Sequence, residues 1–151
     1  MIHAKIKRAG ISKARVKNID VSEAEKMPGV MATLVGSEIP VNSFGPSYQD
    51  QPVMVNGTVF HAGDPVAAVA ATTEQLALDA LDKIKIDYEP LEAVYDPIEA
   101  MKDNAPQVHE GESNIYSSKV IQKGDVEQGF EESDRIYENT FSTQMVEHVP
   151  M

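Results

Sequence analysis

The chain has 151 residues, of which 42% are hydrophobic and 25% charged, with a net charge of −11 and no cysteine. This composition is typical of one soluble globular domain, and the acidic balance disfavours non-specific binding to nucleic acid. The lack of cysteine excludes disulfides, thiolate zinc sites and iron–sulfur ligation within the chain. Because the N-terminus is no signal peptide and no run of about 18 apolar residues exists, we expect a soluble, cytoplasmic protein.

The charge is unevenly distributed along the chain. Residues 1–71 carry seven basic and six acidic side chains, a balance of +1, whereas residues 72–151 carry six and eighteen, a balance of −12. Six of the basic residues lie within 1–18, which leaves a phosphate- or RNA-binding arm as one alternative. Their alternation with aliphatic residues favours the other alternative, the solvated faces of two strands.

These two strands are expected over 2–8 and 14–20, where apolar and polar residues alternate. A short helix over 21–26 should follow, with Asp20 or Ser22 as its N-cap. The Met-Pro-Gly sequence after the helix is predicted to end it.

The next segment predicts a strand and a long loop. An apolar run over 30–35 has strand length, and residues 36–58 are rich in proline, glycine, serine and asparagine. Within that loop the Asn56-Gly57 pair predicts a hairpin turn between strands over 53–55 and 58–60.

The middle of the chain predicts a strand, a helix and a second strand. The small apolar residues over 66–70 favour a central strand. Thr72, with Gln75 three residues later, fits a capping box for a helix that ends near Lys83. The alternating residues 84–88 predict the second strand.

The last third of the chain predicts fewer packed elements. A short helix is expected after Asp96-Pro97, an irregular extended segment over 103–124, a short acidic helix over 126–132 and a strand over 135–143. Strands separated by helices indicate an α+β or mixed α/β domain with one core. The chain stops at 147–151 without a polar tail, so we expect the reading frame to continue for several hundred residues.

No catalytic, cofactor-binding or metal-binding residue is predicted from the residue pattern. The four histidines do not pair at metal-ligand spacing, so structural or solvated roles are expected for His3, His61, His109 and His148. The crowded acidic residues provide no pair in an apolar pocket, and no calcium loop, glycine-rich phosphate loop or nucleophile motif is present.

Two stretches carry a resemblance to a known family. The first runs Gly-Asp-Pro-Val-Ala from Gly63 and continues through Ile-Asp-Tyr-Glu-Pro-Leu over 86–91. The second includes Lys-Gly-Asp-Val over 123–126 and ends with Glu147-His148 and Pro150-Met151. The chain resembles the N-terminal α/β-hammerhead domain of molybdenum hydroxylases of the xanthine dehydrogenase and aldehyde oxidase family. Glu92 stands where proline is usual in that family.

The resemblance implies a hammerhead domain with a small mixed sheet, short helices and an extended C-terminal arm. The core would span 1–103, and residues 104–151 would form an arm and strand that lead into a molybdopterin-binding domain. The parent subunit would hydroxylate an aldehyde, a purine or another N-heterocycle. Its molybdopterin, in the cytosine dinucleotide form, and its 2Fe–2S clusters and FAD would lie in partner domains or subunits. Glu147 and His148 are expected to be structural.

Two functions compete at this point. In the first, the chain is an inactive scaffold fragment that packs on the molybdopterin-binding domains and the iron–sulfur and flavin subunits. In the second, it is a free-standing module that binds a small ligand or a protein. If the first is right, apolar partner surfaces are expected, and the isolated chain is expected to self-associate. The candidate partner residues are Phe44, Tyr48, Val53, Met54 and the segment 107–122.

Overall fold

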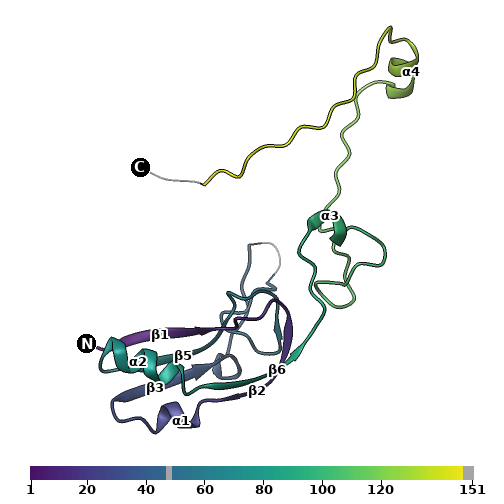
Figure 1. Ribbon diagram of the computed structural model, residues 1–151. Helices are drawn as coiled ribbons and strands as arrows, with labels where there is room; N and C mark the ends of the chain where they lie inside the picture. Colours follow the sequence, from purple (N-terminus) through teal and green to yellow (C-terminus); the bar gives the residue numbers. More distant parts are fainter. Residues whose placement is uncertain (47–48, 148–151) are drawn as a thin grey trace. The chain divides into compact units, whose positions relative to one another are not determined.

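The computed structural model describes residues 1–46 and 49–147, and the chain divides into two compact units, Met1–Tyr116 (unit 1) and Ser117–Met151 (unit 2). Unit 1 contains all the strands of the described residues (Figure 1). In chain order the elements are β1 (His3–Arg8), β2 (Ala14–Asp20), α1 (Ser22–Glu25), β3 (Val30–Val35), the 3-10 turn η1 (Gly36–Glu38), β4 (Thr58–Val59), β5 (Pro65–Ala71), α2 (Glu74–Leu81), β6 (Lys85–Pro90), α3 (Pro97–Ala100) and α4 (Val126–Glu131).

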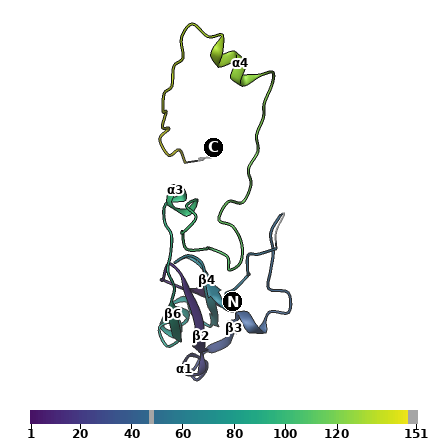
Figure 2. The same ribbon diagram turned by 90° about the vertical axis from the view of Figure 1, so that its right-hand side faces the viewer.

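The strands form two three-stranded sheets, in the orders β1-β5-β3 and β4-β2-β6, and every described pair is antiparallel (Figures 1 and 2). The α+β class is therefore confirmed, but the expected small mixed sheet is replaced by two antiparallel ones. The reason lies in the connections: β1 and β3 both run opposite to β5, which reaches them from a distant part of the chain.

β5 is the central strand of its sheet, as predicted. Its small and β-branched residues suit a strand with neighbours on both sides. One face of β5 presents Ala67 and Val69 to α1 and α2, where they join a core cluster with Ala24 and Leu81. At the start of the strand, Val66 is fully buried in a second cluster. The core of unit 1 thus forms on a strand with no charged residue.

The two lysines of β1 point toward α2, although the alternation of the sequence predicts that they point into solvent. Lys5 lies beside Val69 in the register, and its ammonium pairs with Glu74 of α2. Lys7 donates a hydrogen bond of 3.0 Å to the carbonyl of Leu81, the last residue of α2. Ile6, between the two lysines, is 47% exposed. The strand alternative therefore holds for β1, but its two lysines face α2, because the first residue of that helix offers the Glu74 carboxylate and the last offers the Leu81 carbonyl.

α2 begins one residue later than the capping box suggested. Thr73, in an extended conformation, caps the helix, and its Oγ1 accepts a hydrogen bond of 3.2 Å from the Leu76 amide. Thr72 is engaged elsewhere, since its amide donates to the Gly29 carbonyl at the end of the sheet. Gly29 itself has φ of +93°, a conformation that favours glycine.

The N-cap of α1 also differs from expectation. Val21 occupies the cap position without a side-chain hydrogen bond. Asp20, the residue before the cap position, instead accepts a hydrogen bond of 3.0 Å through its Oδ1 from the Ser22 amide. By contrast, α3 follows the prediction, because Asp96 Oδ1 accepts from the Ile98 and Glu99 amides and Pro97 occupies the first turn.

The predicted hairpin around Asn56-Gly57 is not formed. Thr58 and Val59 form β4, but they pair with β2, and residues 53–55 are not a strand. The amide of Val55 donates to the carbonyl of Pro65 at 2.7 Å, which holds this segment against the start of β5. The chain bends at Asn56-Gly57, but tertiary pairing selected different partners for the segments on either side.

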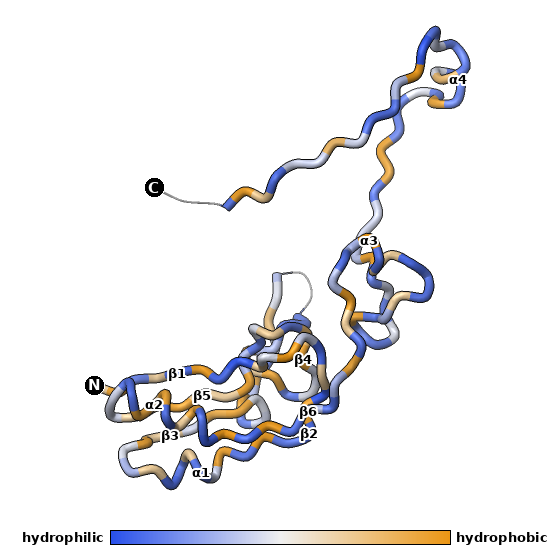
Figure 3. Tube along the Cα trace, viewed as in Figure 1, coloured by the Kyte–Doolittle hydropathy of each residue, from blue (hydrophilic) through white to orange (hydrophobic). Residues whose placement is uncertain are grey.

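Unit 2 contains one helix and extended chain among its described residues. Asp125 caps α4 by accepting from the Gln128 amide at 3.0 Å, as the sequence indicated. The strand predicted over 135–143 is absent, because no described strand lies beside it to complete its hydrogen bonds. Short hydrophobic stretches alternate with hydrophilic ones along this unit (Figure 3).

Candidate functional site

The described histidines have structural surroundings. His61 Nε2 lies 2.8 Å from Asp64 Oδ1, and its Nδ1 accepts a hydrogen bond of 3.1 Å from the Gly63 amide. Asp64 Oδ2 also accepts from the Phe60 amide at 2.7 Å, so His61 and Asp64 close one turn together. His3 lies on β1, and His148 is outside the described residues.

His109 joins the segment after α3 to the body of unit 1. Its ring lies 4.7 Å from that of Phe60, measured between centroids, and its Nε2 is 4.0 Å from Asp50 Oδ2. Lys13 donates a hydrogen bond to the carbonyl of Gln107. Asn114 Oδ1 accepts a hydrogen bond of 2.8 Å from the Val108 amide, which closes a loop. The expectation of an unpacked segment over 103–124 is therefore wrong for its first part.

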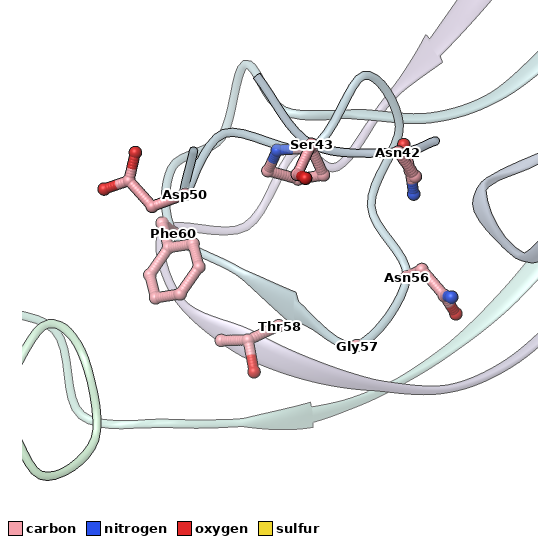
Figure 4. Close-up of a pocket in the computed structure, with 8 residues that line it drawn as sticks. Asn42, Ser43, Asp50, Asn56, Gly57, Thr58 and Phe60 are labelled. Atoms are coloured by element: carbon pink, nitrogen blue, oxygen red, sulfur yellow. The ribbon is translucent and has the colours of Figure 1, made fainter. Parts of the chain in front are cut away.

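A hollow of unit 1 lies beside the long loop (Figure 4). It has a volume of about 550 Å³, with Asp50 and Phe60 at one side and Asn42 and Asn56 at the other. Ser43, Pro52, Gly57 and Thr58 complete the lining. The lining thus offers amides, hydroxyls and one carboxylate, and it contains no cationic side chain.

The wall of this hollow is held by Asn42. Its Nδ2 donates to the carbonyls of Gly36 and Met54, at 3.1 and 2.7 Å, and its Oδ1 accepts from the Met54 amide at 3.0 Å. A Cβ on Gly36 would lie 2.4 Å from the carbonyl oxygen of Val55, so only glycine allows this approach. Asn42 is saturated by backbone groups and is a structural residue.

The partner-surface candidates have different environments. Phe44 and Val53 are exposed, as expected of a docking surface. Met54 is buried, with 4% of its surface exposed, so its prediction as a partner residue was wrong. It is buried because Asn42 fixes its backbone against the core side of the loop. Tyr48 lies outside the described residues.

A cluster of three charged side chains lies on the β4-β2-β6 sheet. Glu89 Oε2 is 2.7 Å from Lys17 Nζ and 3.7 Å from Arg15 Nη1. The hydrogen bond and charge of Lys17 lower the pKa of Glu89, and Arg15 adds a smaller effect. Beside it, burial raises the pKa of the Tyr88 hydroxyl. All three charged groups are half exposed, which is typical of a surface ion pair and not of a catalytic acid.

The described residues offer no cluster of metal ligands, and the hollow beside the loop does not fit a nucleotide-type cofactor. Within residues 1–46 and 49–147, no group of three histidine, aspartate or glutamate side chains could hold a metal ion. The sequence provides no thiolate for iron. The hollow beside the loop presents a carboxylate where the phosphates of a nucleotide-type cofactor would require cations or a nest of amides. No helix in the described part is long and apolar enough to cross a bilayer.

Comparison with known proteins identifies the family. Residues 1–92 match the model of the a/b hammerhead domain of aldehyde oxidase and xanthine dehydrogenase. The chain is 37% identical over 150 residues to the nicotinate dehydrogenase large molybdopterin subunit of Eubacterium barkeri, covering 99% of this chain and 35% of that protein. It is 33% identical over 138 residues to the xanthine dehydrogenase of Dictyostelium discoideum, covering 89% of this chain and 9% of that protein.

Among solved structures, the aldehyde oxidoreductase from Desulfovibrio gigas superposes with a TM-score of 0.76 at 29% identity, covering 88% of this chain and 16% of that one. The chain therefore spans about a third or less of the length of these relatives. The fold and the family resemblance seen in the sequence are both confirmed. This chain belongs to the aldehyde oxidase and xanthine dehydrogenase family, and its residues 1–92 form the a/b hammerhead domain.

Proposed function

We propose that this chain is a scaffold element of the molybdopterin-binding large subunit of a molybdenum hydroxylase, without an active site of its own. The observation that carries the proposal is the match of 99% of the chain to only 35% of a large molybdopterin subunit. The hammerhead core would end near residue 103, and residues 104–151 would lead into the molybdopterin-binding domain.

The proposal places the cofactors in other parts of the enzyme. A molybdopterin in the cytosine dinucleotide form, 2Fe–2S clusters and FAD would lie in partner domains or subunits of a cytoplasmic assembly. The donor set of this chain supports that division, since the sequence offers no thiolate and the one charged group in the lining of the hollow beside the loop is the Asp50 carboxylate. The chain would position its neighbours, and the chemistry would belong to the cofactors they hold.

The substrate class of the parent enzyme is an aldehyde, a purine or another N-heterocycle. Relatives of similar identity are named for nicotinate, for xanthine and for aldehydes. Because one hammerhead domain serves all three, its sequence does not distinguish among these substrates. Selectivity would be decided by side chains of the domains that bind the substrate.

The test is the composition of the native assembly. The protein carrying this sequence is purified from its own cells, and molybdenum, iron and flavin are measured together with the mass of each chain. We expect molybdenum in the assembly and none in the 151-residue chain produced alone, which should also show no hydroxylase turnover. A purified assembly that contains this chain with all its partner chains but no molybdenum would refute the scaffold role and favour the free-standing module. When isolated, the chain should self-associate through exposed apolar residues such as Phe44 and Val53.

A further inference from the structure

On one face of the β1-β5-β3 sheet, Val66 at one end is buried in the second core cluster, and the remainder of the face is apolar and partly exposed within unit 1. Cross-strand registers place its residues in two rows, each with one member from every strand. We call this set the bare face. Its residues are Ala4, Ala70 and Ala32 in one row and Ile6, Ala68 and Leu34 in the other.

The opposite face of the same sheet shows what a covered face looks like. There Ala67 and Val69 of β5 are buried under α1 and α2, and Lys5 and Lys7 bond to α2. The bare face contains no charged side chain and is only partly shielded: Ile6 is 47% and Leu34 39% exposed, and Ala68 and Ala70 are half-buried. An antiparallel sheet can leave one face to solvent, but that face is then usually polar, whereas an exposed apolar patch in a soluble protein marks an interaction site.

The side chains of the bare face define its shape. Ala68 on the central strand lies between the larger Ile6 and Leu34 on the two outer strands. Two strand spacings separate the outer pair by roughly 10 Å, which is about the diameter of an α-helix. The central residue of each row is alanine, whose small side chain allows the backbone of a helix to approach the sheet closely. The geometry favours a helix over a strand, because the unfilled surface is a face and not an edge.

We propose that the bare face is the binding site of an α-helix with an apolar stripe, supplied by the same large subunit from outside residues 1–151. This inference rests on the proposed scaffold function and names the partner of that scaffold. The helix would be apolar where it contacts Ile6, Ala68 and Leu34, because the bare face contains no charged side chain that could pair with a charge on the helix.

Two observations favour a helix of the same subunit over a second copy of this chain. The bare face has six residues, four of them alanine, whereas a stable complex between separate chains uses about 20–30 residues a side. A small patch suffices when partner and patch belong to one chain, because the connection raises the effective concentration. In the aldehyde oxidoreductase from Desulfovibrio gigas, the matching part is 16% of the chain, so most of that chain is available to supply the cover.

A photo-crosslinking experiment on the native assembly tests this directly. Leu34 is replaced by the photoreactive residue p-benzoylphenylalanine, and the crosslinked peptides are identified by mass spectrometry. Leu78 is the matched control position, since it is 41% exposed and lies on α2, which packs on the opposite face of the sheet. We expect position 34 to crosslink to one helix of the large subunit outside residues 1–151, and position 78 to give no such product.

Crosslinks from position 34 to any part of residues 1–151, in the same or a second copy, to a strand or loop, or to no protein at all would overturn the proposal. Molybdenum in the same purified assembly reports on the scaffold function separately. An assembly that contains molybdenum but lacks the helix crosslink therefore refutes only the helix-binding site.

Charge substitutions provide a second measurement. Leu34→Glu should lower the yield of molybdenum-containing assembly about tenfold or more, because it buries an unpaired carboxylate under the helix, whereas Leu78→Glu should leave the yield unchanged. In the isolated 151-residue chain both variants should unfold at the temperature of the wild type, since both side chains are exposed there. Equal yields of assembly for the two variants would contradict the inference.

Discussion

The two units of this chain treat their large apolar side chains differently. Unit 1 buries Val55, Val59, Val66 and Val69 almost completely. Unit 2 leaves its large apolar side chains exposed, and they are Val120, Ile121, Val126, Phe130, Ile136, Tyr137, Phe141, Met145 and Val146. Apolar content is present in both units, so it is not what separates them.

The two units differ in whether segments that are distant in the sequence pair and pack with one another. β5 of unit 1 pairs with β1 and β3, which lie far away in the chain, and two helices cover the result. The described residues of unit 2 contain no strand that could pair with residues 135–143. Alternation of apolar and polar residues thus indicates that one face of a segment can be buried, but burial also requires another segment that packs against that face. The bare face of unit 1 teaches the same lesson on a smaller scale.

Hydrogen exchange should show the largest contrast between the units. In the isolated chain, amides of β5 from Val66 to Ala71 should be protected at least about a thousandfold, because they open only with the whole of unit 1. Amides over 135–143 should exchange at the rate of unstructured chain. Exchange measured by NMR or mass spectrometry checks this, and comparable protection in both segments would break the comparison.

A glycine pair provides the next largest effect. Gly36→Ala should destabilise unit 1 by about 3 kcal/mol or more, because the new Cβ would meet backbone oxygens of Met54 and Val55 that cannot move aside. Gly129→Ala in α4 is the matched control, since nothing lies within 4 Å of its Cβ position. Urea unfolding followed by circular dichroism should show a lower midpoint for the first variant alone.

Truncation of one aliphatic side chain in each unit sharpens the comparison further. Val69→Ala should lower the free energy of unfolding by about 2 kcal/mol, because it removes buried methyl groups and leaves a small cavity. Ile136→Ala should change it by less than about 0.5 kcal/mol, since Ile136 is 61% exposed. Thermal unfolding of the two variants measures both values. A large loss for Ile136→Ala would reveal packing of unit 2 that the comparison denies.

The smallest effect is expected from surface ion pairs of unit 1. Hydrogen bonds and charges from Lys5 and Lys17 lower the pKa of Glu74 and Glu89, respectively. Their stabilising contribution is therefore present above the ordinary pKa of a carboxyl and is lost as the pH falls through the lowered, folded-state value. Glu74→Gln with Glu89→Gln should flatten the acid side of the stability curve slightly, whereas Glu127→Gln in unit 2 should not. Unfolding midpoints measured from about pH 5 to pH 2 cover this range.

Several features could be predicted from the residues alone because their causes are local. Asp96 and Asp125 cap the helices that follow them, since an aspartate side chain reaches the amides two and three residues ahead. The small β-branched run over 66–70 marked a central strand, because such residues suit burial on both sides. The Gly63 and Tyr88 blocks indicated the family, which the match over residues 1–92 confirms.

The remaining features depended on tertiary partners. Alternation along β1 could not show that the lysines point toward α2, because the carboxylate of Glu74 and the carbonyl of Leu81 come from some 70 residues away. Residues 53–55 and 135–143 carried strand patterns, but a strand exists only where another strand accepts its hydrogen bonds. The sequence by itself determined which segments are apolar and where helices begin. Tertiary structure alone decided which faces are covered, because coverage depends on distant pairing and leaves the bare face open in unit 1.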